Sequence, residues 1–395
     1  MVERVYLDWN ATAPLRREAR AALEEALALA GNPSSVHAEG RAARHAVERA
    51  REQVAALVAA KPADVFFTSG GTEANTLALT PSIETAAEKR PRGRLLISAI
   101  EHASVRAGAR FAREAIAEIA VDADGRVDLA ALTAAVAEAP RPLVAIMLAN
   151  NESGVVQPIA EAAAIVHAAG GLLLVDAAQA VGRIPCDIGA LGADLLTLSA
   201  HKIGGPKGVG ALVRARDDIH IADPLIRGGG QERGMRAGTE NVAGIAAFGA
   251  AAAVAHSERA AEAAQMLALR QELEAGLQAI SRQAVIFGAG AVRLPNTTLF
   301  AAQGMKAETA VIAFDLEGVA VSSGAACSSG KVQPSHVLAA MGVSPALVRG
   351  AVRVSLGRAT TRADVGRFLD AWRKLSVALS KGTREQPRNG RVRTI

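Results

Sequence analysis

Cysteine and aromatic residues are scarce in this chain of 395 residues, and each scarcity limits how the chain can be stabilised. The two cysteines are Cys186 and Cys327, and no CxxC pair or Cys/His cluster has the spacing of a zinc site. Neither a disulfide framework nor a metal centre is therefore expected. Aromatic residues make up 3% of the chain and hydrophobic residues 50%, so alanine-rich helices must do much of the packing.

Long apolar runs are also missing. No run approaches the roughly 18 residues that span a bilayer, and the N-terminal residues lack the apolar core of a signal peptide. We therefore expect a cytoplasmic protein without membrane contact.

Basic residues are concentrated at the C-terminal end. The formal net charge is +5, and most of it falls in residues 381–395, where Glu385 is the acidic residue. The basic residues of this segment are Lys381, Arg384, Arg388, Arg391 and Arg393. The composition predicts a disordered, solvated tail rather than a binding arm, and no nucleic-acid partner is expected.

Strand and helix patterns alternate up to about residue 250. Short apolar runs indicate strands at 65–68, 94–98, 143–148, 172–175 and 195–198, and helical periodicity marks 41–58, 129–138 and 159–169. This alternation predicts an α/β fold with a mostly parallel sheet between helices. An alanine-rich helix reaching Ile280 should lead to a smaller domain, with strands at 299–300, 319–321 and 352–356 and helices at 335–341 and 363–378.

Two polar residues follow strands of this predicted sheet. Asp176 closes the apolar run Gly171–Val175, and Lys202 follows the run Ala193–Leu198 through Ser199, Ala200 and His201. Because ligands bind at the carboxyl ends of parallel strands, both side chains should reach one crevice. Pyridoxal phosphate needs a lysine to hold it as a Schiff base and an acidic partner for its pyridine nitrogen. The pair therefore predicts a site for that cofactor.

The segment Thr68-Ser-Gly-Gly-Thr-Glu-Ala-Asn75 offers a weaker signal for a phosphate site. Its two glycines would let the backbone approach an anion closely, and Thr72 is expected to cap a helix whose free N–H groups face that anion. It is not a Walker A loop, because no lysine follows the glycines at the required spacing.

A series of ordered motifs runs from Tyr6 to about Thr361. They are Tyr6–Pro14, Gly31–His37, Thr68–Asn75, Glu101-His102, Asn150–Gln157, Asp176–Gln179, Ser199–Lys202, Arg227–Arg233, Arg236–Glu240, Ser322–Gly330 and Val352–Gly357. Together they resemble the motifs of the cysteine desulfurases of the class V aminotransferase group. The stretch around Cys327 resembles the short, small-residue form of the housekeeping and nitrogen-fixation enzymes.

The resemblance implies a fold type I transferase dependent on pyridoxal 5′-phosphate, with a mostly parallel, seven-stranded-type sheet and a smaller α+β domain. The implied division is an N-terminal segment, 1–15, that packs with the small domain, a large cofactor-binding domain, 16–255, a small domain with the cysteine loop, 256–380, and the tail, 381–395. The implied reaction converts L-cysteine to L-alanine and leaves sulfur on an enzyme cysteine as a persulfide. An acceptor, most simply a scaffold protein, then receives it for iron–sulfur cluster assembly or a related sulfur pathway.

Position by position, the resemblance implies roles for cofactor-binding residues. Lys202 would hold the cofactor, Asp176 would pair with the pyridine nitrogen, and His102 would stack on the ring and relay protons. The remaining implied contacts are Gly71, Thr72, Ser199 and His201 at the phosphate and Asn151 and Gln179 at the ring hydroxyl.

Further implied roles concern the partner subunit and the substrate. Thr239 would reach the phosphate of a neighbouring subunit, which implies a homodimer. Arg353 and Asn32 match positions that hold the substrate carboxylate, and a guanidinium can donate two parallel hydrogen bonds to such a group.

Cys327 is the expected nucleophile. It lies among serines and glycines that are too small to pack as a core, whereas Cys186 is expected to be a packing residue. Two alternatives stay open. One is a class V transaminase, or a lyase preferring selenocysteine, with the same cofactor; the other is a catalytically silent scaffold. Measuring whether the protein makes alanine or a keto acid distinguishes a desulfurase from a transaminase. A protein that never takes up cofactor would support the scaffold.

Overall fold

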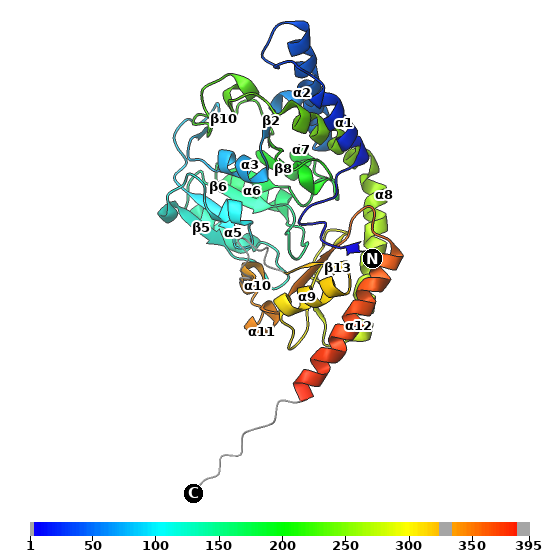
Figure 1. The fold of residues 1–395 in the computed structure, drawn as a ribbon. Helices are drawn as coiled ribbons and strands as arrows, with labels where there is room; N and C mark the ends of the chain where they lie inside the picture. Colours follow the sequence, from blue (N-terminus) through cyan, green and yellow to red (C-terminus); the bar gives the residue numbers. More distant parts are fainter. Residues whose placement is uncertain (1–3, 324–333, 385–395) are drawn as a thin grey trace.

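A seven-stranded sheet forms the centre of the larger part of the molecule (Figure 1). The structure is a computed structural model that describes residues 4–323 and 334–384. The strands, in spatial order, are β2 (Val65–Thr68), β9 (Gly210–Arg214), β8 (Leu195–Ser199), β7 (Leu172–Asp176), β6 (Leu143–Met147), β4 (Leu95–Ser98) and β5 (Ile116–Ile119). β9 runs antiparallel to both of its neighbours, and the other neighbouring strands are parallel. The prediction of a mostly parallel, seven-stranded-type sheet is confirmed.

Helices cover both faces of this sheet, because both faces are apolar. Along β7, Leu172 and Leu174 belong to one core, and Leu173 and Val175 belong to the core on the opposite face. The former core is covered by α3 (Gly71–Ala78) and α4 (Ala103–Arg106). Helices on the opposite face are α2 (Ala38–Leu57), α5 (Leu129–Ala137), α6 (Ile159–Ala168), α7 (Ile188–Leu191) and the first half of α8 (Val242–Ile280). α1 (Arg17–Leu27) packs along α8.

A second core lies around a four-stranded antiparallel sheet. Its strands, in order, are β11 (Val285–Ile286), β12 (Thr297–Ala301), β15 (Val352–Ser355) and β14 (Ser322–Ser323). The end of α8, α9 (Ala307–Leu316) and α12 (Arg362–Arg384) pack on it, with α10 (His336–Ala340) and α11 (Pro345–Val348) nearby. Several of the chain's few aromatic residues meet here, with the Phe314 and Phe368 rings stacked at 5.0 Å and Trp372 against Phe300 at 5.2 Å.

The N-terminal segment and α8 join the two cores. β1 (Val5–Tyr6) pairs in parallel with β13 (Val319–Ala320), and both Val5 and Leu7 are buried in the second core. α8 contributes residues to both cores without a break, and Figure 1 shows it running along one side of the molecule. The proposed domain boundary after residue 255 falls inside this helix, so the division stays a prediction.

The sequence patterns missed or misplaced some elements. Neither β5 nor β9 was expected, and α12 continues to Arg384, beyond the point at which a disordered tail was predicted to begin. The rest of that tail prediction, residues 385–395, lies outside the described residues. In the part of the chain that the structure covers, no helix combines the length and apolarity that crossing a membrane requires.

Candidate active site

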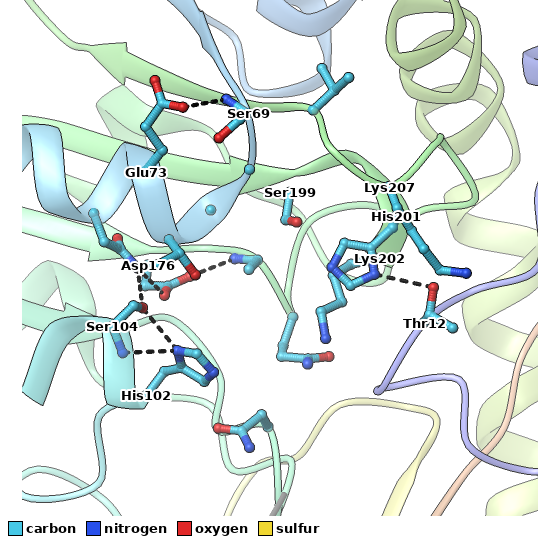
Figure 2. Close-up of a pocket in the computed structure, with 18 of the residues that line it drawn as sticks. Thr12, Ser69, Glu73, His102, Ser104, Asp176, Ser199, His201, Lys202 and Lys207 are labelled. Atoms are coloured by element: carbon cyan, nitrogen blue, oxygen red, sulfur yellow. Dashed lines mark hydrogen bonds between the residues drawn. The ribbon is translucent and has the colours of Figure 1, made fainter. Parts of the chain in front are cut away.

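A cavity of about 610 Å³ lies at the carboxyl ends of β7 and β8 (Figure 2). Asp176 is the last residue of β7, Ser199 is the last residue of β8, and Lys202 lies in the turn that follows. The predicted site residues in the cavity wall are Gly71, Thr72, His102, Asn151, Asp176, Gln179, Ser199, His201 and Lys202. The fold therefore brings the predicted carboxylate and lysine into one cavity.

Asp176 is fixed by two hydrogen bonds. Its Oδ1 accepts from the backbone N–H of Ala178 and its Oδ2 accepts from Asn75 Nδ2, both at 2.9 Å. The Asn75 amide is itself oriented, because the Thr197 hydroxyl donates to its Oδ1 at 2.7 Å. Sequence reasoning gave Asn75 no role, since its contact with Asp176 arises only when α3 packs across the ends of β7 and β8. A carboxylate held in this way suits a protonated ring nitrogen.

Lys202 reaches the N-terminal segment. Its Nζ donates to the backbone oxygens of Asn10, at 2.6 Å, and Ala11, at 3.0 Å. Burial, together with the positive charges of Arg353 and Arg183, lowers the pKa of Lys202 to about 7. A large fraction of this amine is consequently uncharged at neutral pH, which is the form that attacks a carbonyl carbon.

Both histidines of the cavity are neutral near pH 7. His102 begins α4, and its Nδ1 accepts from the Ser104 backbone N–H at 3.2 Å and lies 2.8 Å from the Ser104 hydroxyl. Burial lowers the pKa of His102. Burial and the charge of Lys202 lower the pKa of His201 to about 4. Because Nδ1 of His102 is an acceptor, its proton sits on Nε2, and the flat ring is free to lie against a planar ligand.

The glycine segment forms the end of the cavity suited to a phosphate, although its cap differs from the prediction. Gly70, not Thr72, is the N-cap of α3, and Glu73 Oε2 accepts from the Ser69 backbone N–H at 2.9 Å. A Cβ on Gly210 would lie 2.5 Å from the Gly70 carbonyl carbon, so the segment can cross β9 only over a glycine. The first turn of α3, Ser199 and His201 together supply hydrogen-bond donors to this end.

These groups fit pyridoxal phosphate. The cavity wall includes the N-terminus of α3, which suits an anion, the fixed carboxylate of Asp176 and the amine of Lys202, whose pKa is lowered to about 7. Lys202 would hold the cofactor, Asp176 would face its ring nitrogen, and Gln179 and Asn151 would lie by its hydroxyl group.

Two buried carboxyl groups near the site were not predicted. Glu101 accepts hydrogen bonds from the Ser98 hydroxyl, at 2.6 Å, and the Met147 backbone N–H, at 2.7 Å, and burial raises its pKa to about 8. Glu152 accepts from the Ser335 hydroxyl at 2.6 Å, and burial raises its pKa to about 7. Glu101 and Glu152 appeared in the sequence only inside longer motifs, and no local pattern distinguishes a buried glutamate from an exposed one.

Three predicted site residues are absent from the cavity wall formed by the described residues. Thr239 instead lines a neighbouring cavity of about 270 Å³. Asn32 is exposed between α1 and α2, where its Oδ1 accepts from the Ser34 backbone N–H at 2.9 Å. Arg353 is buried on β15, where it forms an ion pair with Asp8 at 2.7 Å and donates to the Asn151 backbone oxygen at 2.9 Å. Their predicted roles stay predictions.

Of the two cysteines, Cys186 lies within the described residues. Cys186 is buried, its Sγ donates to the Ile184 backbone oxygen at 3.4 Å, and burial raises its pKa to about 12. A thiol with so high a pKa is a poor nucleophile, which agrees with a packing role. The prediction for Cys327 falls outside the described residues.

Comparison with known proteins places the chain among enzymes. The family model for aminotransferase class-V matches residues 5–368. A cysteine desulfurase of Cereibacter sphaeroides is 43% identical over 93% of this chain and 95% of its own length. The cysteine desulfurase IscS of Dictyoglomus turgidum is 40% identical over 95% of both chains. The crystal structure of a NifS-like protein from Rickettsia africae is 35% identical, with a TM-score of 0.86 over 95% of this chain and 100% of that one. These likenesses confirm the predicted family and fold class.

Proposed function

Because the chain belongs to the aminotransferase class-V family and, within it, to the cysteine desulfurases, we propose that it converts L-cysteine to L-alanine and passes the sulfur to Cys327. The observation that carries this proposal is the shared cavity of Asp176 and Lys202, in which the lysine pKa is lowered to about 7. A carboxylate and a reactive amine so arranged are what a pyridoxal-phosphate enzyme requires.

The cofactor, when bound, supplies a ring that withdraws electrons from the α-carbon of an amino acid. Lys202 Nζ would hold the cofactor, and its lowered pKa suits the amine to accept a proton from the substrate. Asp176, which Asn75 and the Ala178 backbone N–H hold in place, would keep the ring nitrogen protonated. The neutral ring of His102 would lie against the cofactor, and the first turn of α3 with Ser199 and His201 would hold the phosphate; all of these line the same cavity.

Cys327 performs the sulfur transfer in this proposal. Its thiolate bonds to the sulfur of cysteine as the carbon–sulfur bond breaks, and the substrate carbon ends as the methyl group of alanine. Cysteine and one enzyme thiol thus give alanine and one enzyme persulfide, so no external oxidant is needed. The persulfide then passes to an acceptor, and a scaffold protein for iron–sulfur cluster assembly is the partner we propose.

The substrate and subunit contacts belong to the same proposal. Arg353 and Asn32 hold the carboxylate of cysteine, and Thr239 acts on the phosphate bound by the other subunit of a homodimer. Thr239 lines a separate cavity that borders the main one through Ser69, Gly208 and Val209, which suits a residue that reaches a phosphate from another subunit. A reducing compartment, the cytoplasm, suits an enzyme that depends on a free thiol.

The direct test supplies L-cysteine and a small thiol reductant to the purified, cofactor-loaded protein. We expect alanine and sulfide in equal amounts and no keto acid. A keto acid produced in step with amino-group transfer would instead identify a transaminase.

A further inference from the structure

Arg183 is a buried arginine in the turn that follows β7, and its side chain faces the back of the active site. It is 7% exposed. Its Nη1 donates to the backbone oxygen of Gln179 and, at 2.8 Å, to the Gln179 side-chain Oε1. Its Nη2 donates more weakly to the backbone oxygens of Trp9, at 3.4 Å, and Lys202, at 3.5 Å. These acceptors are uncharged oxygens on three separate segments that meet at the cavity.

Such a charge is costly to bury. A guanidinium whose partners are carbonyl and amide oxygens gains less than one that faces a carboxylate, and burial lowers the pKa of Arg183 to about 10. An apolar side chain of similar volume would fill this space without that cost. The arginine must therefore contribute something that a methionine would not.

Its first contribution concerns the Gln179 amide. A guanidinium has donors and no acceptor, so the atom of Gln179 that faces Arg183 must be the oxygen. The amide nitrogen is thereby turned the other way, and it donates to the Asn10 backbone oxygen at 3.0 Å. Gln179 lines the cavity, and its nitrogen is the end of the amide that points away from Arg183.

Its second contribution concerns Lys202. The Asn10 oxygen that accepts from Gln179 also accepts from Lys202 Nζ at 2.6 Å. Arg183 therefore contacts the backbone of Lys202 directly and contacts its amine through Gln179 and Asn10. The other charged groups acting on this amine are Arg353, which disfavours its protonated form, and Asp176 and Asp8, which favour it.

We propose that Arg183 is a positioning residue of the active site, which turns the Gln179 amide nitrogen toward the cofactor and holds the Lys202 amine ready to bind it. The proposal rests on the proposed function for the identity of the cofactor. It does not depend on desulfuration, because its effect is exerted on cofactor capture.

The test measures capture of pyridoxal phosphate by cofactor-free protein, as a rate at several pH values and as a dissociation constant. For Arg183→Met we expect the dissociation constant to rise about tenfold, since an oriented hydrogen bond to a charged oxygen is lost. The pH at which capture is half-maximal should move up by roughly half a unit, because one cation near Lys202 is gone. Arg183→Lys should leave the pH of half-maximal capture unchanged and still bind the cofactor more weakly. Lysine retains the positive charge but lacks the planar guanidinium that donates two parallel hydrogen bonds.

Arg92→Met is the matched control. Arg92 is also buried, at 3% exposed, and donates to the backbone oxygens of Arg141, at 3.2 Å, and Gly170, at 3.4 Å, but none of these residues lines the cavity. It should lose stability without changing either capture measurement.

A double-mutant cycle tests the route through Gln179. If Arg183 acts by orienting that amide, Arg183→Met should weaken cofactor binding far less when Gln179 is already methionine. Equal effects in both backgrounds would contradict the orientation, and Arg183 variants that capture cofactor like the native protein would overturn the proposal. If Arg183→Met does not fold, Arg183→Lys decides the question by its dissociation constant alone. Normal capture behaviour without alanine production in the native protein would refute the proposed function and leave the role of Arg183 standing.

Discussion

The ion pair between Arg353 and Asp8 allows the role of Arg353 in substrate binding to be separated from a structural role. Arg353 Nη2 lies 2.7 Å from Asp8 Oδ1, and the two side chains are 3% and 20% exposed. Nη1 donates to the Asn151 backbone oxygen at 2.9 Å, and Asn151 lines the cavity. If Arg353 also binds the carboxylate of cysteine, Asp8 and the substrate compete for one guanidinium.

Two substitutions should then change the KM for cysteine in opposite directions. Arg353→Met removes a charge-assisted fork, which is worth about 2–4 kcal/mol, so KM should rise by roughly thirty- to a thousandfold. Asp8→Asn keeps the shape but removes the competing charge, so KM should fall by about two- to tenfold. It should also lower the pKa of Lys202 further, since the Asp8 charge raises it. Both variants should lose free energy of unfolding, by roughly 1–3 kcal/mol, because each leaves a largely buried charge without its partner.

The assay is alanine production at varied cysteine concentration, with chemical denaturation of the same preparations. The ion pair between Arg293 and Glu274, at 2.8 Å and with side chains 6% and 16% exposed, is the matched control. Arg293→Met should lose stability and keep the native KM. The reasoning fails if Arg353→Met keeps the native KM, or if Asp8→Asn and Arg353→Met shift KM in the same direction.

Three further predictions concern buried groups around the site. Between pH 7 and 9 the unfolding free energy of cofactor-free protein should rise by up to about 2 kcal/mol more than that of Lys202→Met, because only the unfolded lysine is fully protonated there. Relative to the native protein, Glu101→Gln should gain stability as the pH rises from about 4.5 to about 8, because the unfolded glutamate ionises in that range while the buried one stays protonated; a difference that stays constant across that range would refute this. Ser335→Ala should cost roughly 1–3 kcal/mol in denaturant titrations, since it removes both the cap of α10 and the hydrogen bond to Glu152, and Glu152→Gln, which keeps an acceptor, should cost less.

The central strands were predictable because each is a short, fully buried run with polar or glycine residues at its end. β7 and β8 have this form, and the polar residues after them led directly to Asp176 and Lys202. β5 lacked the signal because it is an edge strand with an exposed glutamate, Glu118. β9 was missed because it begins at a glycine, shortly after the glycine-rich stretch 204–208, which carries no strand pattern.

The supporting residues of the site could not be predicted in the same way. Asn75 can donate to Asp176, and the Asn10 backbone oxygen can accept from Lys202, only after segments far apart in the chain have packed together. The N-cap of α3 was misplaced because Thr72 is the usual kind of capping residue, whereas the close crossing over Gly210 requires the chain to turn at Gly70. For Thr239 the proposed contact involves a second chain, which no pattern within one sequence can position.

The most direct test of the proposed sulfur transfer compares two serine variants after incubation with L-cysteine. Alanine is quantified, and the masses of the peptides that contain each cysteine are measured by mass spectrometry without a reducing agent. The native protein and Cys186→Ser should produce alanine and carry one added sulfur atom on Cys327. Cys327→Ser should still take up pyridoxal phosphate and change its absorption when cysteine is added, but alanine and the added sulfur should nearly vanish. Alanine released by Cys327→Ser at the native rate, or sulfur found on Cys186, would contradict the account.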